Sequence, residues 1–228
     1  MSKLSSIGRK FLMALSGFFL MIFLLQHFSI NILSVLSPNT FNEVSQFMGT
    51  NFLVQGILQP VLIFGIVFHF VMAFVLEIHN RNARPVKYYG ASTSGGSFLS
   101  KNMIISGLTI LIFLALHMYD FWWHEMSVKY LQGDLSGLNA AGELRYHEEL
   151  VAKFQNIGRV LIYSLAFVFL GLHTAHGFQS AFQSVGANHP KYTPIIKKIG
   201  FFYSVILPAG FVFIAFIIFY STKIHLII

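Results

Sequence analysis

Apolar residues gather in five long segments along the chain, with shorter and more polar stretches between them. The segments cover residues 11–33, 53–78, 103–123, 154–182 and 201–222. Each segment, coiled as a helix, is long enough to cross a hydrocarbon layer of about 30 Å. A helix satisfies its own backbone in lipid, and the strict alternation over about ten residues that marks barrel strands is absent. The pattern predicts an all-α fold, a bundle of five transmembrane helices that forms one domain over residues 1–228.

The composition agrees with a membrane protein and excludes several other classes. Hydrophobic residues make up 55% of the 228 positions and charged residues 10%, whereas soluble domains carry about 25% charged residues. The net charge of +7 lies at the ends of the apolar spans, so we do not expect a nucleic-acid partner. The chain has no cysteine, which rules out disulfides, thiolate-bound iron–sulfur clusters and covalent c-type haem.

Charge also predicts an orientation in the membrane. One side of the five spans collects ten of the fifteen basic residues with Glu77 as its single acid: Lys3, Arg9, Lys10, Arg81, Arg84, Lys87, Lys101, Lys191, Lys197 and Lys198. The positive-inside rule places this side in the cytoplasm. We therefore expect a multi-pass protein of the bacterial inner membrane, with a cytoplasmic N-terminus and an external C-terminus. The connections at residues 34–52 and 125–153 are then external loops.

Histidine is abundant and reaches deep into the predicted spans. Five of the ten histidines lie at span ends or in connections: His79, His124, His147, His189 and His225. The other five lie inside spans: His27, His69, His117, His173 and His176. Ionisable side chains at such depth are rare, usually face the bundle interior and usually have a function.

The buried histidines sort into two depths. His27 and His117 each lie 16 residues along an outward-running span, which places both about 24 Å from its cytoplasmic end. His69 and His173 each lie about ten residues before the cytoplasmic end of their spans, in the inner half. Two helices therefore contribute a histidine at each level.

Facing imidazoles at one depth are what bis-histidine ligation of a haem requires, because the iron takes one nitrogen from each side of the macrocycle. A four-helix bundle offers a slot for such a ring. Two levels predict two haems of the b type. Small residues in the spans either admit the ring or form ordinary helix contacts: Gly17, Gly65, Gly107, Gly171 and Gly177.

Other interpretations of the histidines remain. They could form interhelical hydrogen bonds without a cofactor, or a proton or metal relay in a transporter. A membrane di-iron site needs about eight clustered histidines, and "HTAH" at residues 173–176 is the one short box here. The dispersed pattern, with a histidine on each of four spans, favours haem.

At this point the chain resembles a known family, the single-polypeptide diheme cytochrome b anchor of succinate:quinone oxidoreductases, which include succinate dehydrogenases and fumarate reductases. The resemblance covers nearly the whole chain as a membrane-anchor domain. The matching motifs are "SGFFLMIFLLQH" at 16–27, "IFGIVFHF" at 63–70, "FLALHMYD" at 113–120 and "GLHTAHGFQSAFQSVG" at 171–186.

The resemblance implies a role for each membrane histidine. His27 and His117 would be axial ligands of the outer haem, and His69 and His173 of the inner haem. In the family motif the fourth-helix ligand precedes a glycine by four residues, and Gly177 follows His173 by four. His176 would then be a neighbour rather than a ligand.

Family membership further implies partners and substrates. A flavoprotein subunit and an iron–sulfur subunit would dock on the cytoplasmic face, and electrons from succinate would pass through both haems to a membrane quinone, with menaquinone expected. The chain would be the membrane subunit of the enzyme, without a flavin of its own. The alternatives are a cytochrome b anchor of a hydrogenase or formate dehydrogenase, and a cofactor-free transporter or structural membrane protein.

Polar residues near the haem levels supply further candidates. Asp120 lies three residues after His117, on nearly the same helix face, and with Trp123 and Arg159 it predicts an outer quinone site. An interfacial aromatic belt with an ordinary ion pair is the other interpretation. The candidates for contact with the haems or their propionates are His176, Ser16, Lys101 and Gln179.

Overall fold

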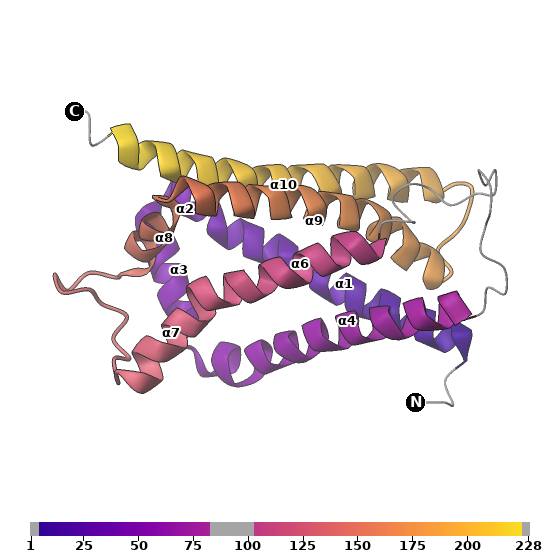
Figure 1. The fold of residues 1–228 in the computed structure, drawn as a ribbon, viewed down its shortest axis with the longest axis horizontal. Helices are drawn as coiled ribbons and strands as arrows, with labels where there is room; N and C mark the ends of the chain where they lie inside the picture. The colour runs from indigo at the N-terminus through magenta and orange to yellow at the C-terminus, as the bar shows by residue number, and fades with distance from the viewer. Residues whose placement is uncertain (1–4, 83–102, 225–228) are drawn as a thin grey trace.

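The computed structural model describes residues 5–82 and 103–224, and these are almost entirely helical (Figure 1). The helices are α1 (Ser6–Asn31), α2 (Leu33–Leu36), α3 (Pro38–Thr50), α4 (Gln59–Asn82), α6 (Met103–His117), α7 (His124–Met126), α8 (Tyr146–Phe154), α9 (Ile157–Ser184) and α10 (Thr193–Ile224). Within the described residues, extended structure amounts to one isolated bridge between Leu138 and Leu144. The all-α prediction is confirmed.

Five helical stretches are long and apolar enough to cross a membrane, as predicted. They run over Ser6–Leu36, Val54–Asn82, Met103–Leu131, Ile157–Ser184 and Thr193–Ser221. The third runs further than the predicted end at residue 123, because α7 and a π-helical turn at Ser127–Leu131 continue it. The fifth begins eight residues before the predicted start, because Lys197 and Lys198 occupy its first two turns. The cytoplasmic placement of the N-terminus stays a prediction.

Helix ends are fixed by capping side chains. Ser5 accepts a hydrogen bond from the amide of Gly8 at 3.1 Å and so caps α1. The side chain of Asn156 accepts from the amides of Gly158 and Arg159 and caps α9. Such caps satisfy amides that have no partner within the helix. They fix where the helices that carry His27 and His173 begin.

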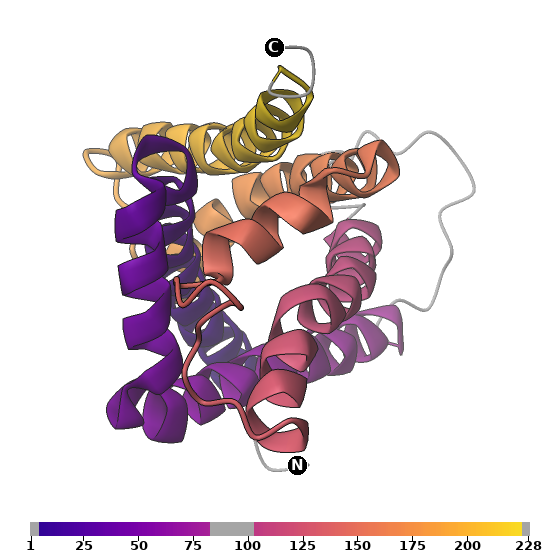
Figure 2. The same ribbon diagram turned by 90° about the vertical axis from the view of Figure 1, so that its left-hand side faces the viewer.

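Viewed from one end, α1, α4, α6 and α9 surround a common axis, and α10 lies outside them (Figure 2). The contacts agree, because α10 packs on α9 and α1, while α1 contacts α4 and α6 contacts α9. The most extensive contact is between α9 and α10, and the buried cluster there includes Val160, Tyr163, Ala215 and Ile218. The fifth helix therefore supports a four-helix frame that carries the membrane histidines.

The two connections predicted as external loops contain helices, which corrects that expectation. Residues 34–52 form α2 and α3, and residues 146–154 form α8. Together α2, α3 and α8 make a capping layer at the end of the bundle opposite the start of α1 (Figure 1). Phe41 and Leu150 are buried in it. These helices have four to thirteen residues, so a search for apolar runs of about 20 residues misses them.

Candidate functional site

Four membrane histidines form two facing pairs. The ring centroids of His27 on α1 and His117 on α6 lie 5.7 Å apart, with an interplanar angle of 84°. Those of His69 on α4 and His173 on α9 lie 6.4 Å apart, with an angle of 70°. The structure thus brings together the same histidines that were matched by depth. Each pair joins two helices on different sides of the bundle axis.

The pairs lie at two levels of the bundle. Ser16 lies beside His69, and Ser16 and His27 are both on α1, eleven residues apart. At a rise of about 1.5 Å per residue, that separation is about 16 Å along the helix. The two pairs are therefore distinct sites rather than one cluster.

The His69–His173 pair is held by hydroxyl groups from the other two helices. Ser16 Oγ on α1 lies 3.0 Å from His69 Nδ1, and Ser106 Oγ on α6 lies 3.3 Å from His173 Nδ1. Both serines are buried. Each histidine is thus fixed at Nδ1 by a serine on the adjacent helix.

The glycine after each serine lies beside the same imidazole. A Cβ placed on Gly17 would lie 3.8 Å from His69 Cε1, and a Cβ on Gly107 would lie 3.4 Å from His173 Cε1. The other three glycines that were predicted to line a haem slot have different neighbours. A Cβ on Gly65 would meet Phe19, one on Gly171 would meet the backbone of α10, and one on Gly177 would meet no atom within 4 Å.

The His27–His117 pair has aromatic surroundings and weaker polar support. Phe23 stacks on His27 and Phe113 stacks on His117, each one helical turn before the histidine. His117 Nδ1 is buried and has no hydrogen-bond partner among the described residues. The Asn31 amide nitrogen lies 3.4 Å from His27 Nδ1, at the long limit of a hydrogen bond.

An internal repeat, missed by the sequence-based predictions, explains why α1 and α6 play the same part. Residues 13–27, "MALSGFFLMIFLLQH", and 103–117, "MIISGLTILIFLALH", share Met, Ser-Gly, Ile-Phe-Leu and His at the same offsets. In both copies the Ser-Gly pair contacts a histidine of the neighbouring helix, and the final histidine belongs to the His27–His117 pair. A comparison of the two outward spans by position would have found this signal.

The predicted quinone residues are only partly brought together. Asp120 is 1% exposed, and its Oδ2 accepts a hydrogen bond from the Tyr163 hydroxyl at 2.7 Å. Its Oδ1 lies 3.1 Å from Arg159 Nη2, at ion-pair distance but outside hydrogen-bond geometry. Trp123 is 54% exposed and stands apart from the pair. Tyr163 was missed, because an aromatic residue in an apolar span looks like ordinary core.

The predicted haem-contact residues have different positions. Ser16 contacts His69 itself. His176 and Gln179 are partly buried on α9, without a hydrogen bond in the described part of the chain. Lys101 lies outside the described residues.

An ion network at the capping layer lies beyond the His27–His117 level. Glu125 pairs with Lys129 at 2.7 Å and with Arg145 at 2.6 Å, and Arg145 also pairs with Glu149 at 2.5 Å. Lys129 donates to the carbonyl of Gly49 on α3. Burial lowers the pKa of Arg145, but its hydrogen bonds to the two carboxylates outweigh this and raise that pKa. The network ties the third span to α3 and α8.

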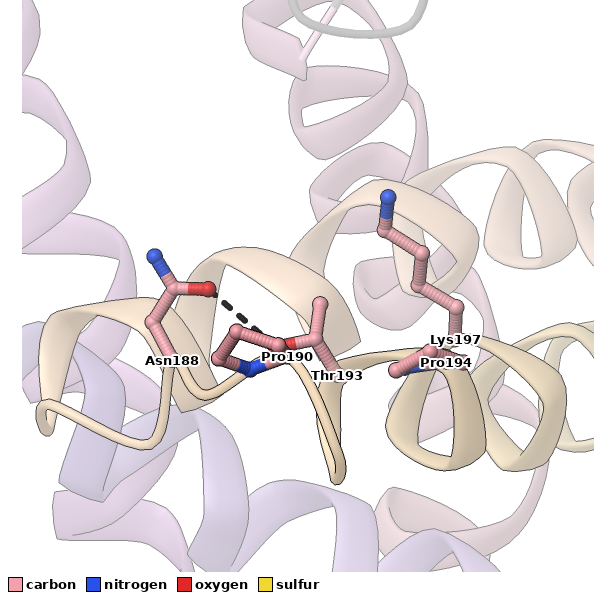
Figure 3. Close-up of a pocket in the computed structure, with 5 residues that line it drawn as sticks. All are labelled: Asn188, Pro190, Thr193, Pro194 and Lys197. Carbon is pink, nitrogen blue, oxygen red and sulfur yellow. Dashed lines mark hydrogen bonds between the residues drawn. The ribbon is translucent and has the colours of Figure 1, made fainter.

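An open pocket lies at the turn between α9 and α10, outside the histidine pairs. Figure 3 shows its lining of Asn188, Pro190, Thr193, Pro194 and Lys197, with a volume of about 550 Å³. The Thr193 hydroxyl donates to Asn188 Oδ1 at 3.1 Å. Its exposed lining has none of the membrane histidines, so we do not assign it to the site.

The spacing of the two pairs fits a shared iron. A metal–imidazole bond is about 2 Å long, so two imidazoles on opposite sides of one iron have ring centroids about 6 Å apart. The measured values of 5.7 and 6.4 Å lie on either side of this distance. Among the described residues, no group of three or more His, Cys, Asp or Glu side chains could hold a bare metal ion. A haem supplies four nitrogens of its own and needs only two protein ligands.

A search of protein-family models, curated protein sequences and solved structures finds no match to this chain.

Proposed function

We propose that this protein is a diheme cytochrome b membrane anchor of a succinate:quinone oxidoreductase. The observation that carries the proposal is the pair of facing histidines at each of two levels, 5.7 and 6.4 Å apart, with one histidine from each of four membrane helices. A cofactor-free bundle has no need for two such pairs at matching depths.

His69 and His173 would hold the inner haem b, and His27 and His117 the outer one. Bound there, haem supplies one-electron transfer across the bundle. The helices keep the four imidazoles in place, and the aromatic residues around His27 and His117 keep water from that level. Gly17 and Gly107 lie beside the rings of His69 and His173.

The partners follow from the same assignment. A flavoprotein and an iron–sulfur subunit would dock on the cytoplasmic face, near the His69–His173 level, and a membrane quinone would bind at the opposite end. Asp120, which follows His117 by three residues, and Arg159 beside it are the polar residues that could serve a quinone, with menaquinone expected. The reaction class is succinate oxidation coupled to quinone reduction, or its reverse.

Membranes that contain the complete complex test this function. We expect succinate to reduce the b-type haem and to drive reduction of a naphthoquinone analogue, and His173→Ala to abolish both. Formate and hydrogen serve as comparison donors. Reduction of the haem by formate or hydrogen, with no response to succinate, would instead assign the chain to a formate dehydrogenase or hydrogenase.

A further inference from the structure

We propose that Ser16 and Ser106 are positioning residues for the inner haem, which orient His69 and His173 and commit their Nε2 atoms to the iron. This inference rests on the proposed function and goes beyond it, because it assigns roles to two residues that are not themselves ligands.

The direction of each serine–histidine hydrogen bond depends on where the single hydroxyl proton lies. A hydroxyl has one proton to donate. Ser16 Oγ donates it to the carbonyl of Met13 at 2.9 Å, and Ser106 Oγ donates to the carbonyl of Met103 at 3.0 Å. Toward the imidazoles, both oxygens can then only accept.

This arrangement favours one imidazole tautomer. With the hydroxyl protons on the carbonyls, His69 and His173 carry their own proton on Nδ1 and donate it to the serines at 3.0 and 3.3 Å. The other ring nitrogen, Nε2, then keeps its lone pair. A neutral histidine whose Nδ1–H is held by a second residue is the form that binds metals, and the outer hydrogen bond also raises the basicity of the ligand.

The arrangement occurs twice, which argues against chance. Both serines belong to the repeated segment of α1 and α6, and each is followed by the glycine that faces the same imidazole. Each Ser-Gly pair thus lies against one imidazole, with the serine oxygen next to its Nδ1. A serine placed only to satisfy itself within its helix would need no histidine at this distance.

The outer level has no equivalent. His117 Nδ1 has no partner in the described chain, and His27 Nδ1 faces an amide nitrogen at 3.4 Å rather than a hydroxyl acceptor. Loss of either serine should therefore affect the inner haem alone.

The test compares Ser16→Ala and Ser106→Ala with Ser204→Ala in the purified complex. Ser204 is a matched control: it is buried on α10, donates to the carbonyl three residues earlier at 2.9 Å, and makes no hydrogen bond with a histidine in the described residues. The readouts are the midpoint potential of each haem from a redox titration and the low-spin ferric EPR signal of each haem.

We expect both test variants to raise the midpoint potential of the inner haem and to shift its EPR signal, because a less basic imidazole stabilises ferric iron less. The outer haem and the Ser204→Ala variant should match wild type. Ser16→Cys and Ser106→Cys keep the side-chain volume with a weaker acceptor and should shift the inner potential by less in the same direction. These two variants also serve if the alanine variants fail to assemble.

Two haems with unchanged inner potential and EPR signal in all four variants would overturn the serine assignment and leave the proposed function standing. A shift confined to the outer haem, or an equal shift in Ser204→Ala, would also overturn it. A wild-type complex without haem b would refute the proposed function and this inference together.

Discussion

At the scale of single residues, the main question is which histidine of "HTAH" serves as a ligand. His173 faces His69 at 6.4 Å and is held at Nδ1 by Ser106. His176 has neither a facing imidazole nor a hydrogen bond among the described residues. Depth along the span already favoured His173 over His176, and the structure adds the rotation of α9 that brings His173 to face His69.

We therefore expect His173→Ala to lose the inner haem and keep the outer one, which halves the haem-to-protein ratio. His176→Ala is the matched control on the same helix, and it should retain both haems. The ratio is measured from the absorbance of the purified variants. The opposite result, with loss in His176→Ala and retention in His173→Ala, would reverse the assignment.

Asp120 is a second residue whose environment could not be derived from the sequence. Its carboxylate accepts a hydrogen bond from Tyr163 and forms an ion pair with Arg159. Both partners lie on α9, some 40 positions away in the chain. The sequence indicated Arg159 through its charge but not Tyr163. The trio links the π-helical turn after His117 to the buried face of α9.

Asp120→Ala should lower the free energy of unfolding by about 1–3 kcal/mol, because it leaves the buried Tyr163 hydroxyl without its acceptor and Arg159 without its counter-charge. Trp123→Phe, at an exposed site only three residues away, should change it by less than about 0.5 kcal/mol. Unfolding in detergent micelles measures both variants. Equal stability of the two would show that the trio is not a stabilising contact.

At the scale of elements, the capping layer is the part that apolar periodicity did not predict. α3 and α8 are joined by side-chain contacts across more than 90 residues of sequence, including the Tyr146 hydroxyl, which donates to Gln46 Oε1 at 2.6 Å. Burial, with a further contribution from the Glu125 charge, raises the pKa of Tyr146 to about 12. The neutral phenol is therefore part of the folded capping layer.

This shift predicts a loss of stability in alkali. Because the pKa in the folded protein lies above the usual value of 10, the stabilisation is complete below pH 10 and is lost as the pH rises toward 12. Tyr146→Phe removes the titrating group, so the stability difference between wild type and variant should shrink over that range. A difference that stays constant from pH 9 to about 12 would contradict the assignment.

At the scale of the whole molecule, the sequence predicted the five spans and the depth of the histidines. Helix rise is nearly invariant, so residue number alone places His27 beside His117 along the membrane normal. It does not give the rotation of each helix about its axis. That is why the hydrogen bond of Ser16 to His69 was missed, although Ser16 itself was singled out.

The same limit explains the other differences. The start of α10 at Thr193 was missed because charged residues in its first turns hide a helix from an apolar pattern. The repeat in α1 and α6 is visible in the sequence, but its meaning depends on His69 and His173, which come from other helices. Position along the chain thus predicted the depth of each histidine, whereas the packing of the helices determined which side chains form hydrogen bonds with it.

The measurement that tests the central claim most directly is the haem content of the purified chain, from its reduced-minus-oxidised spectrum together with its protein concentration. Two histidine pairs predict two haem b per chain, with one remaining in His27→Ala and one in His69→Ala. A wild-type chain with no α band of the b type would contradict the account, as would a full complement of haem in either variant.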